Sequence, residues 1–411
     1  MGVKVYPTIQ EIPSEVDLAV LTVPRAALLD VIRECSRKGT KAVIIYASGF
    51  AETGPEGIRL QEEIVRAAQE GGTRVVGPSS LGSYNASARF ASQHILPRES
   101  GPVGVISHSG YLFYYLLLSV ASRRLGTSKG ISCGNDADLT CVDFLEYMGQ
   151  DPDTKIIVAY LEGIGDGRRL FDVARETSRT KPIIVLKGGK TDEGNRVSAS
   201  HTGTLAVPAA VWRALCRQTG IISVESFALM MDTMVALCHL PRSQGKRVGI
   251  ISVPGGLAVA CTDACIEMGL EVPRLSPETR KRLAGVVESV GTSINNPVDL
   301  GPSAPYRPDY YVKESFAIVA GDPNVDMILM ALPGMALKLD ESRDRVVADL
   351  LIKQIAAASK PTVICSSKVQ GWDGGEMKYL AESNLPVFPD VKRTVRVLAK
   401  LAEYGEFLKS A

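Results

Sequence analysis

Two short stretches of this 411-residue sequence decide the fold: Gly104-Val-Ile-Ser-His-Ser-Gly110 and Gly249-Ile-Ile-Ser-Val-Pro-Gly255. Each is a β-branched run that leads through a Ser/Gly turn into a helical pattern, as a strand–turn–helix unit does. The likeness continues downstream, where Asp151-Pro-Asp-Thr-Lys-Ile-Ile matches Asp322-Pro-Asn-Val-Asp-Met-Ile. Because the order is kept, the sequence predicts two related doubly wound domains in tandem. The alternative explanation of the likeness is that any two α/β domains share this strand–turn–helix pattern.

A third pair of matching stretches, Lys181-Pro-Ile-Ile-Val and Lys360-Pro-Thr-Val-Ile, lies further along each copy. Short apolar runs alternate with helical patterns throughout the chain, which indicates parallel sheets covered on both faces. The predicted strands are Leu18–Val23, Ala42–Tyr46, Val75–Gly77, Gly104–Ser107, Ile156–Tyr160, Ile183–Leu186, Val248–Ser252, Met327–Leu332 and Thr362–Cys365. Pro/Gly/charge clusters at Leu96–Pro102 and Leu240–Lys246 are typical of domain joints.

The composition places the chain among soluble intracellular proteins and excludes several other classes. Hydrophobic residues make up 45% and charged residues 22%, as in folded globular proteins, and the net charge of +1 gives no global attraction to nucleic acid or to an anionic membrane. The most apolar run, Tyr111–Ala121, is about half as long as a membrane span. Eight scattered cysteines without a CxxC pair predict reduced thiols in a cytoplasmic protein, and no Cys/His spacing matches a zinc site.

The heptad Ser198-Ala-Ser-His-Thr-Gly-Thr204 surrounds His201 with small residues and has neither strand nor helix periodicity. A loop of this kind suits an imidazole that must approach a phosphate closely. A solvent-exposed loop histidine is the plainer alternative. Glu162 follows an apolar strand, where a carboxylate is placed to accept the N–H of an imidazole, although a solvated strand-end carboxylate explains it as well.

Two turns, at Ser109-Gly110 and at Gly255-Gly256, stand between a strand and a helix. Free main-chain N–H groups and the positive end of the helix favour an anion at such a turn. Glycine is needed in tight turns for backbone reasons too, so each turn is weak evidence when taken alone. Their equivalent places in the two copies suggest two helix N-termini that could face one phosphate.

Together the motifs resemble the NDP-forming acyl-CoA synthetases, relatives of the succinyl-CoA synthetase α subunit. The resemblance runs over nearly the whole chain and is carried by Val23-Pro24, Ser48-Gly-Phe-Ala-Glu52, Gly77-Pro-Ser-Ser-Leu-Gly82, Ser107-His-Ser-Gly110, Gly134-Asn-Asp-Ala-Asp138, Leu161-Glu-Gly163, Ser200-His-Thr-Gly203 and Asn296-Pro-Val-Asp-Leu300. It implies an α/β chain: a CoA-binding Rossmann-like domain over residues 1–98, a flavodoxin-like domain with the phosphohistidine loop over 99–240, and a second flavodoxin-like ligase-CoA domain over 241–411.

The resemblance also implies the reaction: a carboxylic acid and CoA are joined at the expense of ATP or GTP, through an acyl phosphate and a phosphohistidine. By the match, His201 is the phosphohistidine and Glu162 orients it, while Ser109, Gly110, Gly255 and Gly256 cradle phosphate. The residues expected to line the CoA site are Val23, Pro24, Ser48, Gly49, Phe50 and Ser80. The nucleotide and its Mg²⁺ are expected on a separate ATP-grasp β-type subunit in a homo- or hetero-oligomer, and no tightly bound metal is expected in this chain.

Some features depart from the family pattern. The first domain begins after the Gly-rich turn that usually holds the CoA phosphates, so the sequence predicts an incomplete first domain and weak CoA affinity for the chain by itself. Bulky Tyr111, Leu112 and Phe113 follow Ser109-Gly110, where small residues are usual. These departures favour the alternative of a non-catalytic CoA- or acyl-CoA-binding paralogue. A dehydrogenase has little support because the chain has no dinucleotide fingerprint.

Overall fold

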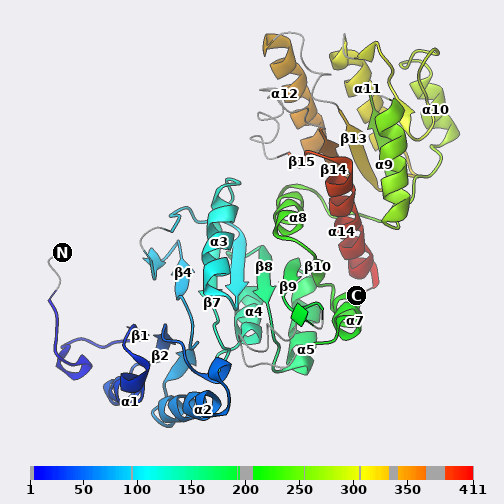
Figure 1. The fold of residues 1–411 in the computed structure, drawn as a ribbon. Coiled ribbons are helices and arrows are strands. Elements are labelled where there is room, and N and C mark those ends of the chain that lie inside the picture. The colour runs from blue at the N-terminus through cyan, green and yellow to red at the C-terminus, as the bar shows by residue number, and fades with distance from the viewer. Residues whose placement is uncertain are drawn as a thin grey trace. The chain divides into compact units, whose positions relative to one another are not determined.

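The computed structural model describes residues 4–93, 96–191, 193–194, 207–253, 255–304, 307–332, 341–366 and 385–410. The chain divides into two compact units, residues 1–227 and 228–411 (Figure 1). Each unit is described by itself below. None of the helices in the described ranges is both long and apolar enough to cross a membrane.

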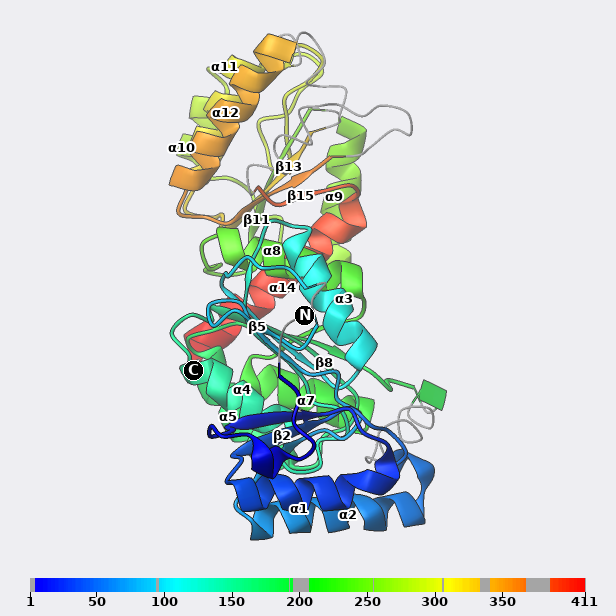
Figure 2. The same ribbon diagram turned by 90° about the vertical axis from the view of Figure 1, so that its left-hand side faces the viewer.

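The first unit begins with a small parallel sheet in the order β1 (Leu18–Leu21), β2 (Ala42–Ile45), β3 (Arg74–Val76). Two helices, α1 (Leu28–Lys38) and α2 (Pro55–Glu70), connect the strands and pack side by side (Figure 2). Right-handed crossovers in a sheet of this order put both helices on the same face. In open α/β sheets, ligands bind at the carboxyl ends of the strands, where the chain leaves each strand for a helix.

A seven-stranded sheet follows in the first unit, in the order β10-β9-β8-β6-β7-β4-β5. Its strands are β4 (Ser83–Asn85), β5 (Phe90–Ala91), β6 (Val103–Ser107), β7 (Thr127–Ser132), β8 (Ile156–Leu161), β9 (Ile183–Lys187) and β10 (Ile222–Val224). The strands from β10 to β7 are parallel, and β4 and β5 add an antiparallel edge. Figure 1 shows β7, β8, β9 and β10 in this part of the chain.

Helices cover this sheet on both faces. Buried side chains of α4 (Cys141–Gln150), α5 (Gly167–Ser178) and α7 (Ala209–Thr219) share one apolar core with alternate residues of the strands, such as Ile106 and Ile157. The opposite face is covered by α3 (Gly110–Ala121), whose Phe113 and Leu117 lie against Gly130. An added Cβ at Gly130 would come within 2.9 Å of the Phe113 ring.

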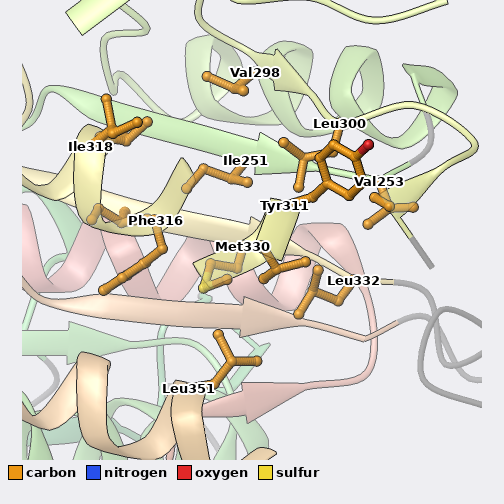
Figure 3. Packing of buried hydrophobic residues seen from close by; sticks show 14 of the residues in the cluster. Ile251, Val253, Val298, Leu300, Tyr311, Phe316, Ile318, Met330, Leu332 and Leu351 are labelled. Atoms are coloured by element: carbon orange, nitrogen blue, oxygen red, sulfur yellow. The ribbon is translucent and has the colours of Figure 1, made fainter. Parts of the chain in front are cut away.

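The second unit contains a five-stranded parallel sheet in the order β12-β11-β13-β14-β15. Its strands are β11 (Val248–Ser252), β12 (Val298–Asp299), β13 (Met327–Ala331), β14 (Thr362–Cys365) and β15 (Val387–Phe388). In its described residues the helices are α8 (Phe227–His239), α9 (Gly255–Glu267), α10 (Pro277–Leu283), α11 (Pro308–Ala320), α12 (Glu341–Ala357) and α14 (Val391–Ser410). Residues of the strands and of α11 and α12, among them Ile251, Phe316 and Leu351, form its core (Figure 3).

The fold class predicted from the sequence is confirmed: a Rossmann-like CoA-binding domain precedes two doubly wound parallel sheets. All nine predicted strands exist, with ends that shift by at most a few residues. The strand that the sequence analysis missed in the middle of the first large sheet is β7. Its sequence, Thr-Ser-Lys-Gly-Ile-Ser, is polar and contains glycine, so it has neither the apolar run nor the β-branched content that identifies a buried strand.

The small sheet and the seven-stranded sheet of the first unit are joined by residues of the loop after β7. Asp138 accepts hydrogen bonds from the Arg74 guanidinium at 2.9 Å and from the Val75 main-chain N–H at 2.7 Å. Asn135 donates to Glu52 at 2.8 Å and to Gln61 at 3.0 Å. The Gly-Asn-Asp-Ala-Asp motif, which the sequence analysis used only as a mark of the family resemblance, therefore connects two sheets.

Candidate functional site

The seven-stranded sheet has one point at which the chain reverses its direction across the strands. From β6 the chain moves through α3 to β7 on one side, and then through α4 back past β6 to β8 on the other side. The connections after β6 and β8 therefore leave on opposite faces, which opens a crevice at the carboxyl ends of these two strands. Ser107 of β6 and Tyr160 of β8 are partners in the register, so residues 108 and 162 lie at this point.

Glu162 is the first residue beyond β8 and is half-buried. Its carboxylate lies near the phenol of Tyr160: burial, then the charge of Glu162 and a hydrogen bond to it, raises the pKa of Tyr160. Gly188, after the neighbouring strand β9, leaves room for this pair. A Cβ at Gly188 would lie 2.7 Å from Tyr160 Oη and 3.2 Å from Glu162 Cγ.

His108, at the end of β6, has both ring nitrogens engaged. Nδ1 accepts the main-chain N–H of Glu162 at 3.0 Å, and Nε2 lies 3.0 Å from Asp136 Oδ2. Since an N–H occupies the lone pair of Nδ1, these partners assign the proton of the neutral ring to Nε2, which donates to Asp136. His108 is thus tied to the ends of two strands.

His108, Asp136 and Cys141 together offer ligand atoms that all lie within 4.8 Å of one another. The hydrogen bonds oppose a metal between them, because the nitrogen that faces the other two residues presents an N–H and no lone pair. The thiols are also unsuited to ligation or attack as they stand. Burial, and after it the charge of Asp136, raises the pKa of both Cys133 and Cys141, so both stay protonated near neutral pH. We interpret the cluster as a hydrogen-bond network.

Four ionisable residues, His108, Asp136, Glu162 and Lys187, influence one another's charge at these strand ends. Burial lowers the pKa of His108, but the carboxylates of Asp136 and Glu162 outweigh it and the pKa is raised. Lys187, the last residue of β9, has its pKa lowered by burial, while the charge of Glu162 acts in the opposite direction. Lys187 Nζ donates to the main-chain carbonyls of Glu162 and Gly188. His108 and Lys187 were not singled out as site residues from the sequence.

The predicted phosphate turn after β6 is the N-terminus of α3. Ser109 is the N-cap residue, and its hydroxyl accepts the N–H of Leu112 at 3.4 Å. Gly110 is required by close packing, because a Cβ there would lie 2.4 Å from Leu81 Cγ. Tyr111 is exposed, so the bulky residue that the sequence analysis noted does not fill the helix N-terminus.

The predicted CoA residues come together at the carboxyl ends of β1 and β2. Arg25, which the sequence analysis did not single out, links the two strand ends by donating from Nη1 to the Gly49 carbonyl at 2.5 Å. Pro24 and Ser48 are exposed at this edge, and Val23 and Gly49 are half-buried. Phe50 has its side chain in the apolar core, so any contact with a ligand would come from its main chain. Ser80 is buried and donates to the Ser132 carbonyl at 2.6 Å.

The remaining predicted residues belong to other parts of the chain. Gly255 and Gly256 open α9 in the second unit, where a Cβ on Gly255 would lie 2.6 Å from Asp299 Oδ2. The Asp299 carboxylate therefore lies beside the N-terminus of α9. His201 lies outside the described residues, in the sequence between the end of β9 and the start of α7.

Comparison with known proteins assigns the family. A domain family described as "Succinyl-CoA ligase like flavodoxin domain" matches residues 100–237, and one described as "CoA binding domain" matches residues 1–86. The chain is 34% identical over 410 residues to the α subunit of acetate–CoA ligase (ADP-forming) I of Pyrococcus furiosus, which covers 98% of this chain and 86% of that protein. The chain belongs to the ADP-forming acyl-CoA ligase family.

Two further relatives support the assignment to the α-type part of this ligase family. The α subunit of acetate–CoA ligase (ADP-forming) II of Pyrococcus furiosus is 37% identical over 328 residues, which are 80% of this chain and 71% of that protein. The solved structure of dinucleotide-forming acetyl-coenzyme A synthetase 1 of Ca. Korarchaeum cryptofilum, in complex with phosphate and ADP, superposes with a TM-score of 0.86 at 31% identity, covering 100% of this chain and 88% of that one. The predicted resemblance and the predicted ligase class are confirmed.

Proposed function

We propose that this ligase chain is the α-type part of an enzyme that joins a small carboxylic acid to CoA while ATP or GTP is converted to the diphosphate and phosphate. Support comes from the relatives, which are named α subunits of ADP-forming acetate–CoA ligases, and from the CoA-binding domain match. The nucleotide and its Mg²⁺ would be held by a separate ATP-grasp β-type subunit. Residues 1–98 would bind CoA, residues 99–240 would carry the phosphoryl chemistry, and residues 241–411 would form the second ligase-CoA domain.

The observation that carries the proposal is the placement of Glu162 at the point where the chain reverses across the sheet. Its carboxylate lies at the carboxyl ends of β6 and β8, and the N-terminus of α3, with Ser109 and Gly110, follows β6 at the same end. In open α/β sheets ligands bind at this place, and a helix N-terminus there favours an anion. The chain that contains His201 also departs from this end, because β9 runs parallel to β8 and ends at Lys187.

In the proposed reaction His201 carries the phosphoryl group between the two sites. In the direction of synthesis, a ring nitrogen of His201 attacks the terminal phosphorus of the nucleotide, so that a P–N bond forms, the P–O bond breaks and the nucleoside diphosphate leaves. The substrate carboxylate then attacks that phosphorus, so that a P–O bond forms, the P–N bond breaks and acyl phosphate results. The CoA thiol, after losing its proton, attacks the acyl carbon, and phosphate leaves as the C–S bond forms. Glu162 would accept the N–H of the ring nitrogen opposite the phosphorylated one, which fixes the tautomer. Main-chain N–H groups at Ser109 and Gly110 would stabilise the charge on the transferred group.

The CoA thiol must reach this site from the N-terminal domain. The proposed groove there is formed by Val23 and Pro24 after β1 and by Ser48 and Gly49 after β2, with the main chain of Phe50 and, deeper, Ser80 at its base. Gly255 and Gly256 remain a second proposed phosphate turn, although Asp299 beside it would repel an anion.

Labelled acetyl phosphate tests the phosphoryl step directly, since the reverse of the second reaction transfers its phosphoryl group to His201 and releases acetate. The wild-type chain should take up label that is lost in acid and kept in base, and His201→Gln should take up none. His239→Gln is a matched control, because His239 ends α8 in the second unit and has no proposed role. Label that persists in His201→Gln would exclude His201 as the carrier.

A further inference from the structure

Both main-chain polar groups of Glu162 are held by side chains. The N–H donates to Nδ1 of His108 at 3.0 Å, and the carbonyl accepts a hydrogen bond from Nζ of Lys187. His108 is 6% exposed and Lys187 3%, so both bonds are made in the interior. At the end of a strand, where ladder bonding stops, water or a turn usually satisfies these groups.

The two side chains are themselves anchored. Asp136 Oδ2 accepts a hydrogen bond from Nε2 of His108 at 3.0 Å. The same oxygen also accepts the main-chain N–H of Cys141 at 3.0 Å. Lys187 makes its second bond to the Gly188 carbonyl at 2.6 Å. The peptide units on either side of Glu162 are therefore connected to the end of β6, to the loop after β7 and to the end of β9.

Burying the Lys187 ammonium costs free energy, and the position of Glu162 gives a reason for that cost. An ammonium group is expensive to bury, and the lowered pKa of Lys187 reflects that cost. Two carbonyl groups do not need a charged donor. A carboxylate that must meet one nitrogen of a phosphorylated imidazole, in contrast, has to be fixed within about half an ångström.

We propose that His108 and Lys187 are positioning residues, which hold the main chain of Glu162 from both sides so that its carboxylate points in one direction during phosphoryl transfer. This inference rests on the proposed function, since it gives Glu162 the role of orienting His201. Neither residue needs to touch substrate. Tyr160 holds the carboxylate itself, and the glycine at position 188 leaves it room.

The rate of labelling by acetyl phosphate tests the inference in the full chain. His108→Leu and Lys187→Met should each slow labelling by about 10-fold to 100-fold, as expected for a reacting group displaced by up to 1 Å. His108→Gln should restore most of the rate lost in His108→Leu, because its side-chain carbonyl can accept from Glu162 while its amide donates to Asp136. If Lys187→Met fails to fold, Lys187→Gln, which keeps one donor for a carbonyl, replaces it.

Lys181→Met is the matched control. Lys181 stands at the other end of the same strand, and its Nζ likewise donates to two main-chain carbonyls, of Met148 at 2.9 Å and of Asp151 at 2.6 Å. Its loss should affect stability as the loss of Lys187 does, yet leave the labelling rate within about twofold, because no proposed catalytic group is attached to those carbonyls. Equal slowing in Lys181→Met and Lys187→Met would show that a general loss of structure is responsible and would overturn the inference.

A double-mutant cycle with Glu162→Gln separates positioning from structural support. If His108 and Lys187 act through Glu162, their substitution should add less than about twofold to the slowing already caused by Glu162→Gln. Slowing factors that multiply would overturn the inference while leaving the role of His201 untouched. Crystal structures give a readout that needs no activity: in Lys187→Met the Glu162 carboxylate should be displaced, and a carboxylate in its original place would also overturn the inference.

Discussion

The two large sheets of this ligase chain have the same construction and different strand ends. The order β10-β9-β8-β6-β7 in the first sheet corresponds to β15-β14-β13-β11-β12 in the second. Ser107 of β6 is the register partner of Tyr160, and Ser252 of β11 is that of Ala331. The repeat found in the sequence is therefore a repeat of topology and of register.

At the amino ends the two copies are alike because of one shared contact. Lys181, just before β9, donates to the carbonyl of Asp151, and Lys360, just before β14, donates to the carbonyl of Asp322 at 2.5 Å. Each lysine thereby connects two neighbouring strands at the edge where they begin. This contact explains the lysine of the repeated Lys-Pro motif.

At the carboxyl ends the chemistry differs. Where the first copy has His108 and Lys187, the second has Val253 and Ser366. The main-chain hydrogen bond is kept: the N–H of Val253 donates to the Ala331 carbonyl, as that of His108 does to the Tyr160 carbonyl. Proline follows Leu332 in the sequence where Glu162 follows Leu161, and proline has neither a carboxylate nor an N–H to donate. The same fold is thus used twice, and the residues that we propose for phosphoryl transfer around Glu162 lie at the carboxyl ends of the strands in the first copy.

The largest effect should come from removing the carboxylate that distinguishes the two copies. Glu162→Gln keeps the shape of the side chain but loses the charge that, as we propose, orients His201, so labelling by acetyl phosphate should fall by about 100-fold. Ser366→Ala, at the corresponding edge of the second copy, should label at a rate within about twofold of the wild type. A similar loss in both variants would contradict the division of roles between the two sheets.

The next effect concerns a contact that the first copy makes with the N-terminal sheet. Burial raises the pKa of Asp138, but the hydrogen bonds from Arg74 and from the Val75 N–H outweigh it and the pKa is lowered. Asp138→Asn should reduce the free energy of unfolding by about 2 kcal/mol at neutral pH. Since the folded-state pKa is below the unfolded one, this stabilisation is complete above about pH 4 and is lost as the pH falls through the folded-state value.

Urea denaturation of both proteins at pH 7 and pH 3 measures that difference. The gap between wild type and Asp138→Asn should narrow at the lower pH. Asp153→Asn is the control, because Asp153 makes an exposed ion pair with Lys129 and should change stability by less than about 0.5 kcal/mol. A gap that is independent of pH would mean that the charge of Asp138 is not responsible.

The smallest effect should come from the contact that the two copies share. Lys360→Met and Lys181→Met should each lower the free energy of unfolding by about 1 kcal/mol, since a main-chain carbonyl loses its donor. Lys353→Met, on the exposed side of α12, is the control for loss of a lysine charge. If either amino-end variant were as stable as this control, the shared motif would need an explanation other than the lysine–carbonyl bond.

Much of the fold could be predicted because its signals are local. Apolar β-branched runs such as Val248–Ser252 and Thr362–Cys365 form the strands where the pattern placed them. Polar or very short strands, such as β7 and the two-residue β12, were not predicted from the sequence. Such segments become strands by pairing with their neighbours in the sheet rather than through their own composition. The motif residues Asn135 and Asp138 link two sheets, and the sequence did not predict this role because their partners lie more than 60 residues away along the chain.

The sequence by itself determined the class of fold, the tandem repeat, the ligase family and the strand-end location of Glu162, since each depends on neighbouring residues or on a recognisable motif. The tertiary structure decided which side chains surround that carboxylate. His108, Lys187 and Tyr160 end three separate segments of the chain, and no local pattern distinguishes them from ordinary strand-end residues. They meet because the register of parallel strands aligns residues that lie far apart along the chain, and register is fixed by the packing of the whole sheet.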